Sequence, residues 1–557
     1  MQALRTFIEE QRELWDVPGV AVGVIRGGEV LLAEGFGTRE LGTSAPVSAR
    51  TIFPIGSTTK SFTAAAVGAL VDDGLLDWDR PVRDDIPGFA MHDPVATERV
   101  TVRDLLSHRS GLPRHEFVWL GHSERTRADL VRRLRSLPLS KDIRQVFQYS
   151  NLGYVTVGHL IELTSGMPWE EFVLTRLLKP LGMEHSNLSV ADTQRAGDFS
   201  QPHERRGEEI TRIPFREFDQ MGPAGGINSC VDDMLRYVRA QLSGGGGVFS
   251  SHAIMQMHGG QIVIPEDRTF PESTRQAYGL GWLVGQYRGH RIVEHNGGVD
   301  GFLTDCMMLP DDGIGVVVLT NLWSFIGPTI AYRAFDALLG LEPVDWSQRM
   351  TSRWDAALAG RAQAKEERPR VEGAALLRSL EEYAGDYEHP GYGRMSITVE
   401  NGALVPRFGT LDLTLTHRHY DVFDLEWHEL AEQEIRFALT FLTGPEGDVV
   451  ALTVPFEEAV EPIRFERQAD PRARDPRVLD GLTGTYEMGP VELVVARKGE
   501  ETLTVATPGN PAAELMPGRG LRFTVKDAGL TVEFVLDDAG RVEKLVVQPL
   551  GVFLPKP

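Results

Sequence analysis

Residues 54–76 of the chain read PIGSTTKSFTAAAVGALVDDGLL, and this stretch sets the expectations for the fold. From about Ser57 its apolar residues recur at helical spacing, which predicts a helix. Gly56 stands just before the predicted helix start, and Lys60 follows Ser57 by three positions. Residues three apart lie on the same face of a helix. The stretch therefore predicts a helix whose first turn carries a serine and a lysine side by side.

Ser57 and Lys60 have two interpretations. A serine hydroxyl needs a base to act as a nucleophile, and a lysine can be that base when burial and the helix N-terminus lower its pKa. The free N–H groups of a helix start can also hold a developing oxyanion. The alternative is an ordinary helix start, with Ser57 as the N-cap and Lys60 as a surface charge. No other Ser-x-x-Lys occurs in the chain.

A second candidate element is FQYSNLGY, residues 147–154, which carries Tyr149 and Asn151 at the expected turn into another helix. A tyrosine near a lysine ammonium can be held as a phenolate and can shuttle protons. An asparagine amide can bind a substrate carbonyl. The alternative is a core tyrosine followed by an asparagine N-cap.

The third element is VEHNGGVDGF, residues 293–302, which follows a predicted strand. Glycines after His295 let a substrate lie against the strand edge, so His295 and Gly297 are candidate substrate contacts. The N–H of Gly298 is the candidate second oxyanion donor, beside that of Ser57. The alternative is a histidine in an ordinary β-bend.

The segment RDLLSHRSG, residues 103–111, contains polar side chains with a different expected role. We expect Asp104, His108 and Ser110 to tie a loop to a helix by hydrogen bonds.

The order of strand-like and helical segments predicts the fold class of the first part of the chain. With 557 residues, 42% of them hydrophobic, we expect two or three folded domains. Strand-like segments at 20–25 and 30–36, and again after about residue 276, flank a helical middle. This predicts an α+β domain over residues 1–340, with an antiparallel sheet flanked by helices plus a helical subdomain. Residues 341–375 read as a helical linker.

Beyond the linker, apolar and polar residues alternate, and turn signals recur about every 8 to 12 residues. This pattern predicts a barrel or a sandwich. The segment LEEYAGDYE, at 380–388, recurs as LDGLTGTYE at 479–487. We therefore expect two similar antiparallel β-barrel modules, at 376–470 and 478–557.

Charge and composition exclude several classes of function. The net charge of −22 disfavours nucleic acid and anionic membranes as partners. No stretch of about 20 apolar residues is present to span a membrane. The N-terminus lacks the apolar region of a signal peptide, so we expect a cytoplasmic protein, with a leader removed ahead of it as the open alternative. Cys230 and Cys306 match no metal spacing, and no phosphate loop or dinucleotide motif occurs, so we expect neither metal nor cofactor.

Six segments, in this order, resemble the serine penicillin-recognising hydrolases, which include penicillin-binding proteins, class C β-lactamases, D-aminopeptidases and related esterases. They are PIGSTTKSFTA, LLSHRSGLP, YSNLGY, PAGGINS, YGLGW and HNGGVDGF, and the resemblance covers about residues 10–335. The two β modules resemble the lipocalin-like C-terminal modules of some prokaryotic members. The overall layout is similar to that of D-aminopeptidases.

The resemblance implies roles for the candidate residues. Ser57 matches the acylated nucleophile, Lys60 its activator, and Tyr149 the general base and proton relay, with Asn151 as a substrate contact. His295 stands where many members carry the lysine of Lys-Thr-Gly, which fixes the carboxylate of β-lactams and peptidoglycan stems. A histidine is charged only part of the time near neutral pH. D-aminopeptidases and esterases of the family commonly carry a histidine here.

We therefore expect a cofactor-independent serine hydrolase that forms an acyl-enzyme on amide or ester bonds of small molecules or short peptides. The resemblance favours an activity like that of a D-aminopeptidase or D-amino-acid amidase. The alternatives are a carboxylesterase, a weak β-lactamase, or a penicillin-binding-like protein with little turnover. The β-barrel modules are expected to form a homo-oligomer or to act as lids.

Overall fold

The computed structural model describes residues 1–366, 370–428, 435–445 and 447–556, and all of their side chains except those of 266–269 and 361–366. The chain forms two compact units. The first contains Met1–Arg370 with the short segments Trp427–Ile435 and Pro455–Pro462, and the second contains the remaining residues. Across the described ranges, no helix is both long and apolar enough to cross a membrane.

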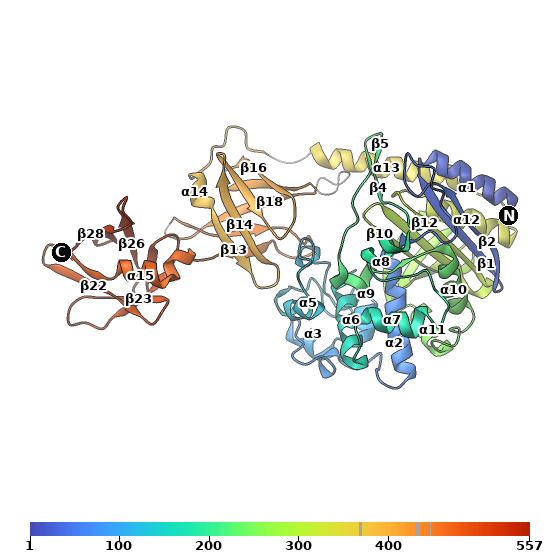
Figure 1. Cartoon of the computed structure of the whole chain (residues 1–557), viewed down its shortest axis with the longest axis horizontal. Coiled ribbons are helices and arrows are strands. Elements are labelled where there is room, and N and C mark those ends of the chain that lie inside the picture. Colours follow the sequence, from blue (N-terminus) through green and yellow to red (C-terminus); the bar gives the residue numbers. More distant parts are fainter. Residues whose placement is uncertain (367–369, 429–434, 446, 557) are drawn as a thin grey trace. The chain divides into compact units, whose positions relative to one another are not determined.

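The first unit is built on an eight-stranded antiparallel sheet with the order β2-β1-β12-β11-β10-β9-β8-β7 (Figure 1). Its strands are β1 (Gly19–Arg26), β2 (Glu29–Gly37), β7 (Ile262–Phe270), β8 (Ser273–Tyr278), β9 (Leu283–Tyr287), β10 (His290–Val299), β11 (Phe302–Leu309) and β12 (Ile314–Thr320). The N-terminal hairpin joins strands from the far end of the domain, because β1 pairs with β12 and places Val22 opposite Val318.

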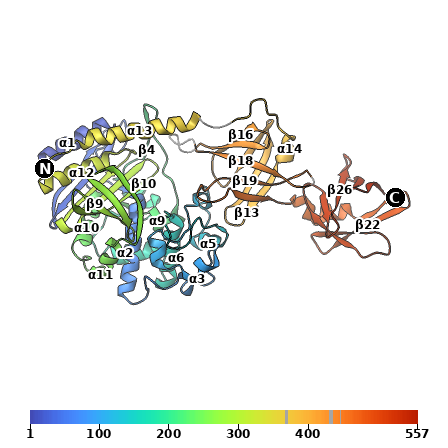
Figure 2. The ribbon, with the colours of Figure 1, turned by 180° about the vertical axis from the view of Figure 1, so that it is seen from behind.

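The two faces of this sheet pack against different helices, because side chains alternate along each strand. On one face, Val22 and Val318 belong to a core shared with three helices. These are α1 (Gln2–Leu14), α12 (Ile326–Leu339) and α13 (Trp346–Glu366), which Figure 2 shows beside the strands. On the other face, Gly23 lies so close to Leu235 of α10 (Val231–Leu242) that a side chain has no room. The sheet is therefore covered on both sides.

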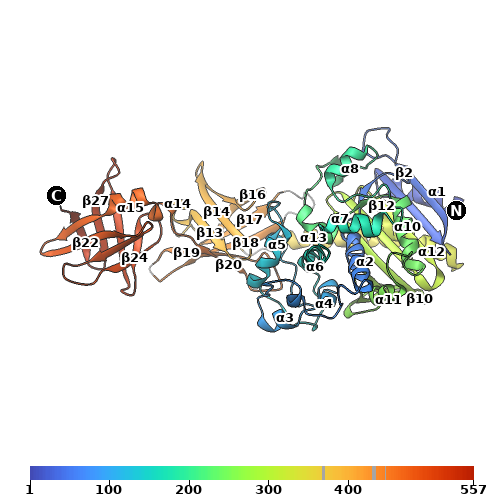
Figure 3. The same ribbon diagram turned by 60° about the horizontal axis from the view of Figure 1, so that its bottom comes forward.

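The helical middle of the chain surrounds one central helix, α2 (Thr59–Asp72). Helix α2 is buried on nearly all sides, as expected for a helix without a polar face. The helices packed around it are α6 (Asn151–Ser165), α7 (Trp169–Val173), α9 (Gly222–Gly225) and α11 (Ser251–His258), and most of them are visible in Figure 3. Helix α7 ends at Val173, and the chain continues as a π-helical turn over Leu174–Leu178.

The second unit contains two antiparallel β modules. The first has the strand order β15-β14-β13-β20-β19-β18-β17-β16, and the second is a closed barrel of β21 to β28. The strands of the first module are β13 (Gly385–His389), β14 (Gly393–Glu400), β15 (Ala403–Arg407), β16 (Leu413–His419), β17 (Val422–Trp427), β18 (Ile435–Thr443), β19 (Val449–Val454) and β20 (Ile463–Arg467). The strands of the barrel are β21 (Gly484–Met488), β22 (Val491–Lys498), β23 (Thr502–Ala506), β24 (Ala513–Pro517), β25 (Arg522–Val525), β26 (Leu530–Leu536), β27 (Val542–Gln548) and β28 (Gly551–Pro555).

The repeat found in the sequence has a structural counterpart. Tyr387 donates a hydrogen bond to the carbonyl of Tyr383 at 2.6 Å, and Tyr486 donates to the carbonyl of Leu482 at 2.8 Å. Both bonds span four residues and fasten the first strand of a module to the short helix before it. The predicted fold class is confirmed, with one closed barrel and one nearly closed barrel after an α+β domain.

Candidate active site

Ser57 lies in the 3-10 turn (Gly56–Thr58) that leads into α2, and Lys60 lies one turn further along. The Nζ atom of Lys60 is 2.9 Å from the Oγ atom of Ser57, and it donates to the carbonyl of Ala224 at 2.8 Å. The Lys60 side chain has no exposure to solvent. Burial, helped by the nearby charge of Arg114, holds its pKa well below the ordinary value. Burial therefore favours the neutral amine, which faces the Ser57 hydroxyl and can accept its proton.

Strand β10 approaches the Ser57 turn backbone to backbone. A Cβ atom on Gly56, whose φ is +49°, would lie 2.9 Å from the amide nitrogen of Gly298. A Cβ atom on Gly297 would lie 2.8 Å from the amide nitrogen of Ser57. Only glycine tolerates such contacts. The two amides that the sequence predicts as oxyanion donors, those of Ser57 and Gly298, therefore belong to adjoining backbone segments.

Tyr149 lies beside the lysine, with Nζ of Lys60 4.9 Å from the centroid of its ring. Burial raises the pKa of Tyr149, although the neighbouring Ser57 hydroxyl opposes the effect. The phenol is therefore protonated, and this differs from the phenolate that the sequence suggested. The reason is that burial removes water from the phenol oxygen and at the same time leaves Lys60 without the positive charge that a phenolate needs.

Asn151 is the first residue of α6 and not its N-cap, which is Ser150. Its Nδ2 donates to the two carboxylate oxygens of Glu116 at 3.0 and 3.3 Å. Its Oδ1 is buried and has no hydrogen-bond partner among the described residues. A buried acceptor without a partner is suited to an N–H group of a substrate.

Glu116 is a residue of the site that the sequence motifs did not reveal. Its side chain is 18% exposed and forms an ion pair with Arg114 at 3.0 Å. Burial raises its pKa, and the charges of Arg114 and Lys60 oppose the rise. The guanidinium of Arg114 lies 5.0 Å from the centroid of the Tyr149 ring, so this pair borders the same site. Glu116 comes three residues after the end of the segment LLSHRSGLP, and that proximity was the one signal available in the sequence.

His295 forms a buried wall of the site. Its Nδ1 lies 2.6 Å from the carbonyl oxygen of Asn296 and must donate, so its Nε2 accepts from the hydroxyl of Tyr278 at 2.9 Å. Burial lowers the pKa of His295 to about 3. A neutral imidazole with both nitrogens occupied does not provide the cation that holds a carboxylate. Tyr278 belongs to the segment YGLGW, to which the sequence assigned no individual role.

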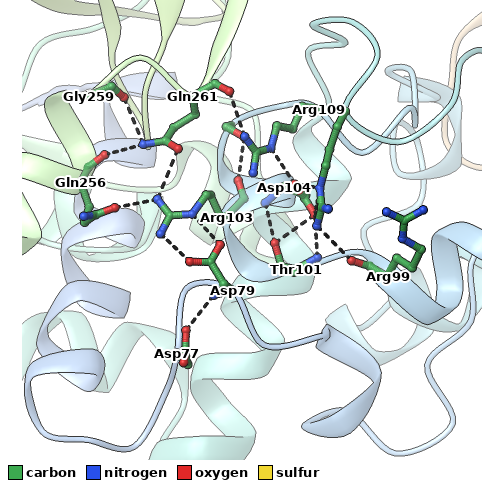
Figure 4. Close-up of polar contacts among 12 residues, drawn as sticks. Asp77, Asp79, Arg99, Thr101, Arg103, Asp104, Arg109, Gln256, Gly259 and Gln261 are labelled. Atoms are coloured by element: carbon green, nitrogen blue, oxygen red, sulfur yellow. Dashed lines mark hydrogen bonds and ion pairs between the residues drawn. The ribbon is translucent and has the colours of Figure 1, made fainter.

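A charged network fixes the loop that supports Tyr149 (Figure 4). Asp104 is fully buried and accepts hydrogen bonds from the N–H of Thr101 at 3.0 Å, from Arg109 at 2.6 Å and from Arg144 at 2.9 Å. Four residues along, His108 accepts from the N–H of Ser150 at 3.1 Å through its Nδ1. The predicted tying role of Asp104 and His108 is therefore present.

Beside this network, Arg103 links Asp79 to Gln256, as Figure 4 shows. Ser110 accepts from the N–H of Leu112 in its own loop at 3.4 Å. Arg103 of helix α4 (Val102–Leu106) is thus joined by a polar contact to helix α11.

Comparison with known proteins gives consistent matches. Residues 4–340 match the Beta-lactamase family, and residues 369–467 match a domain of unknown function, DUF3471. The chain is 32% identical over 457 residues to the unguisins hydrolase of Aspergillus violaceofuscus, an alignment that covers 74% of this chain and 78% of that protein.

Two solved structures share the fold. The octameric penicillin-binding protein homologue from Pyrococcus abyssi aligns with a TM-score of 0.56 at 24% identity, over 84% of this chain and 99% of the other. The D-amino acid amidase from Ochrobactrum anthropi SV3 aligns with a TM-score of 0.54 at 22% identity, over 61% of this chain and 99% of the other.

Proposed function

Because this chain belongs to the beta-lactamase family of serine hydrolases, we propose that it cleaves amide bonds in short peptides or amino-acid amides that carry a free amino group, with a preference for D-residues. The observation that carries the proposal is Glu116, a mostly buried carboxylate held by Asn151. Its charge is close enough to Lys60 to raise the pKa of that amine. A substrate ammonium would gain a partner there, and the carboxylate would gain a second cation.

In this reaction Ser57 attacks the carbonyl carbon while its proton passes to the neutral amine of Lys60. The N–H groups of Ser57 and Gly298 stabilise the oxyanion of the tetrahedral intermediate. When the C–N bond breaks, the protonated phenol of Tyr149 gives its proton to the leaving amine and is reprotonated from the Lys60 ammonium. Water then attacks the acyl-enzyme by the same proton path in reverse and releases the acid.

The buried Oδ1 of Asn151 supports an amide substrate in particular. It would accept the N–H of a peptide bond, a group that an ester lacks. The neutral state of His295 argues against tight binding of a β-lactam carboxylate at that position. The D-preference is supported by the shared fold with the D-amino acid amidase of Ochrobactrum anthropi SV3, and a peptide-like substrate by the relative named unguisins hydrolase.

Matched substrates test the proposal. Wild type and Ser57→Ala are compared on D-alanine p-nitroanilide, its L-isomer, its N-acetyl derivative, p-nitrophenyl acetate and a chromogenic cephalosporin. We expect turnover of the free D-amine substrate by wild type and none by Ser57→Ala. Equal turnover of the N-acetyl derivative would contradict recognition of a free amine. A stoichiometric burst without turnover on every substrate would favour a penicillin-binding-like protein instead.

The Glu116→Gln variant separates amine recognition from catalysis. It keeps the size of the side chain and its contact with Asn151, but it removes the charge. We expect KM for the D-alanine anilide to rise about 10- to 100-fold, the cost of leaving a substrate ammonium without its ion pair. Hydrolysis of p-nitrophenyl acetate, which has no amine, should be unchanged. If both substrates lose activity equally, Glu116 acts on the catalytic groups and not on the substrate amine.

A further inference from the structure

A polar cavity lies on the opposite face of the sheet from Ser57. Along β10 and β11, His295 pairs with Cys306, and the next pair is Asn296 with Asp305. Because successive side chains point to opposite faces, His295 faces the active site while Asn296 and Asp305 face α12 and α13. The cavity there has a volume of about 190 Å³. Its lining consists mainly of Phe270, Arg275, Leu303, Phe325, Met350 and Arg353, together with Asn296 and Asp305.

Two carboxylates lie at or beside the cavity: Asp305 lines it, and Glu294 comes two positions before the lining residue Asn296, on the same face of β10. Asp305 is 5% exposed, and its Oδ2 lies against Gly327 in the first turn of α12. One carboxylate oxygen of its neighbour Glu294 bonds to Arg275, and the other is buried and has no partner among the described residues. Buried polar atoms in native proteins nearly always have a partner. These carboxylates therefore call for a molecule that brings N–H donors.

The remaining walls are apolar or cationic. The guanidinium of Arg353 lies over the rings of Phe270 and Phe325, at 5.7 and 5.5 Å from their centroids. One water molecule takes up about 30 Å³. The volume of the cavity is several times larger, so a single bridging water does not fill it. An organic molecule with an apolar body and an amino group fits this combination of walls.

We propose that the cavity is a second binding site, which takes a small primary ammonium compound with an apolar side group. The ammonium pairs with Asp305, whose neighbour Glu294 adds a second negative charge beside the cavity, and the apolar group packs on Leu303, Phe325 and Met350. The site does not depend on the reaction proposed above. Its occupant does touch the catalytic strand, because Asn296 lines the cavity and its carbonyl accepts the Nδ1–H of His295.

The pH dependence of binding follows from the groups around Asp305. Burial and the charge of Glu294 raise the pKa of Asp305 to about 7, and Arg275 opposes them. Tyr332 of α12 and Arg353 of α13 complete the charged and titratable lining. A cation binds the ionised carboxylate, so affinity should fall as the pH drops below about 7 and should be constant above it until the ligand ammonium itself loses its proton.

Calorimetric titration of the full-length protein with phenethylamine, phenylalanine and phenylacetate tests the site. We expect phenethylamine to bind with one equivalent that remains when the active-site amine contact is removed in Glu116→Gln, and phenylacetate not to bind. Titration with phenylalanine shows whether Arg353 also binds a carboxylate. If phenylalanine binds as tightly as phenethylamine, the site is one for amino acids. If it binds more weakly, the site is one for simple amines. No binding of phenethylamine at millimolar concentration overturns the proposal.

Two variants locate the bound molecule. In Asp305→Asn we expect affinity for phenethylamine to fall by more than about tenfold, because the buried ammonium loses its charged partner. Glu116→Gln, in the candidate active site, should keep one equivalent of phenethylamine; loss of all binding in that variant would place the ligand in the active site and refute the inference. If Asp305→Asn does not fold, the Leu303→Phe variant tests the site instead, because the larger side chain reduces the volume of the cavity without changing its charge. Unchanged binding in Leu303→Phe overturns the proposal.

Discussion

Replacement of Lys60 by methionine is the sharpest test of the candidate active site. Methionine has nearly the length of lysine and fills the same buried space, but it cannot accept a proton. It removes two contacts of Nζ, with the hydroxyl of Ser57 and with the carbonyl of Ala224. A positioned general base contributes about 10²- to 10⁴-fold to rate, so we expect kcat to fall about 10³-fold, or about 4 kcal/mol of activation free energy. KM should change little, because Lys60 is enclosed behind Ser57.

The measurement is the pH profile of kcat/KM for wild type, Lys60→Met and Lys60→Arg on the D-alanine anilide. Activity of wild type requires neutral Lys60, so it should rise with pH through the lowered pKa of this amine and then level off. Arginine retains a cation that does not lose its proton, so Lys60→Arg should be as inactive as Lys60→Met. Near-wild-type activity in Lys60→Arg would refute the neutral-amine reasoning.

Stability gives an independent readout of the same lysine. In the folded state the pKa of Lys60 lies below its ordinary value of 10.5, so at neutral pH the unfolded chain binds more protons than the folded one. The wild-type lysine therefore lowers the free energy of unfolding below pH 10.5. This loss of stability grows as the pH falls and is complete once the pH is below the pKa of Lys60 in the folded state. Lys60→Met lacks this penalty, so its melting temperature at pH 7 should equal or exceed that of wild type. A large loss of stability would show that the amine mainly holds the fold together.

Further predictions concern the surroundings of the site and the β modules. Tyr278→Phe leaves Nε2 of His295 without its donor, and we expect kcat/KM to fall about tenfold with little change in melting temperature, by kinetics and calorimetry. His258, with its pKa lowered to about 3 by burial, is neutral when folded, so acidification from pH 6.5 toward 3 should destabilise the fold; His258→Gln should flatten this dependence in urea titrations at several pH values. Asp104→Asn leaves two arginines without their carboxylate and should cost about 3 kcal/mol of unfolding free energy in urea, whereas a cost near zero would contradict the network. We also propose self-association through the β modules; light scattering should then show a smaller assembly for a chain ending near residue 370, which keeps α13, and unchanged assembly would exclude that role.

Local patterns were sufficient for much of the fold. The two N-terminal strands and helix α2 were predicted because their β-rich and helically spaced apolar residues are local signals. Strand β7 (Ile262–Phe270) was not predicted, since it contains a proline and charged residues and is defined by pairing with β8. Closure of the second barrel was also beyond local patterns, because it depends on pairing of β21 with β28 at the far end of the module.

The sequence by itself determined the Ser57–Lys60 pair, because residues three apart on a helix are neighbours whatever the rest of the chain does. It also pointed to Tyr149, Asn151 and His295, through short segments typical of one family. Tertiary structure alone decided their chemical states. The amine of Lys60, the phenol of Tyr149 and the imidazole of His295 are neutral because distant segments bury them together. Glu116 and Tyr278 join the site for the same reason: their partners, Asn151 and His295, come from other segments, and spacing along the chain does not encode such a contact.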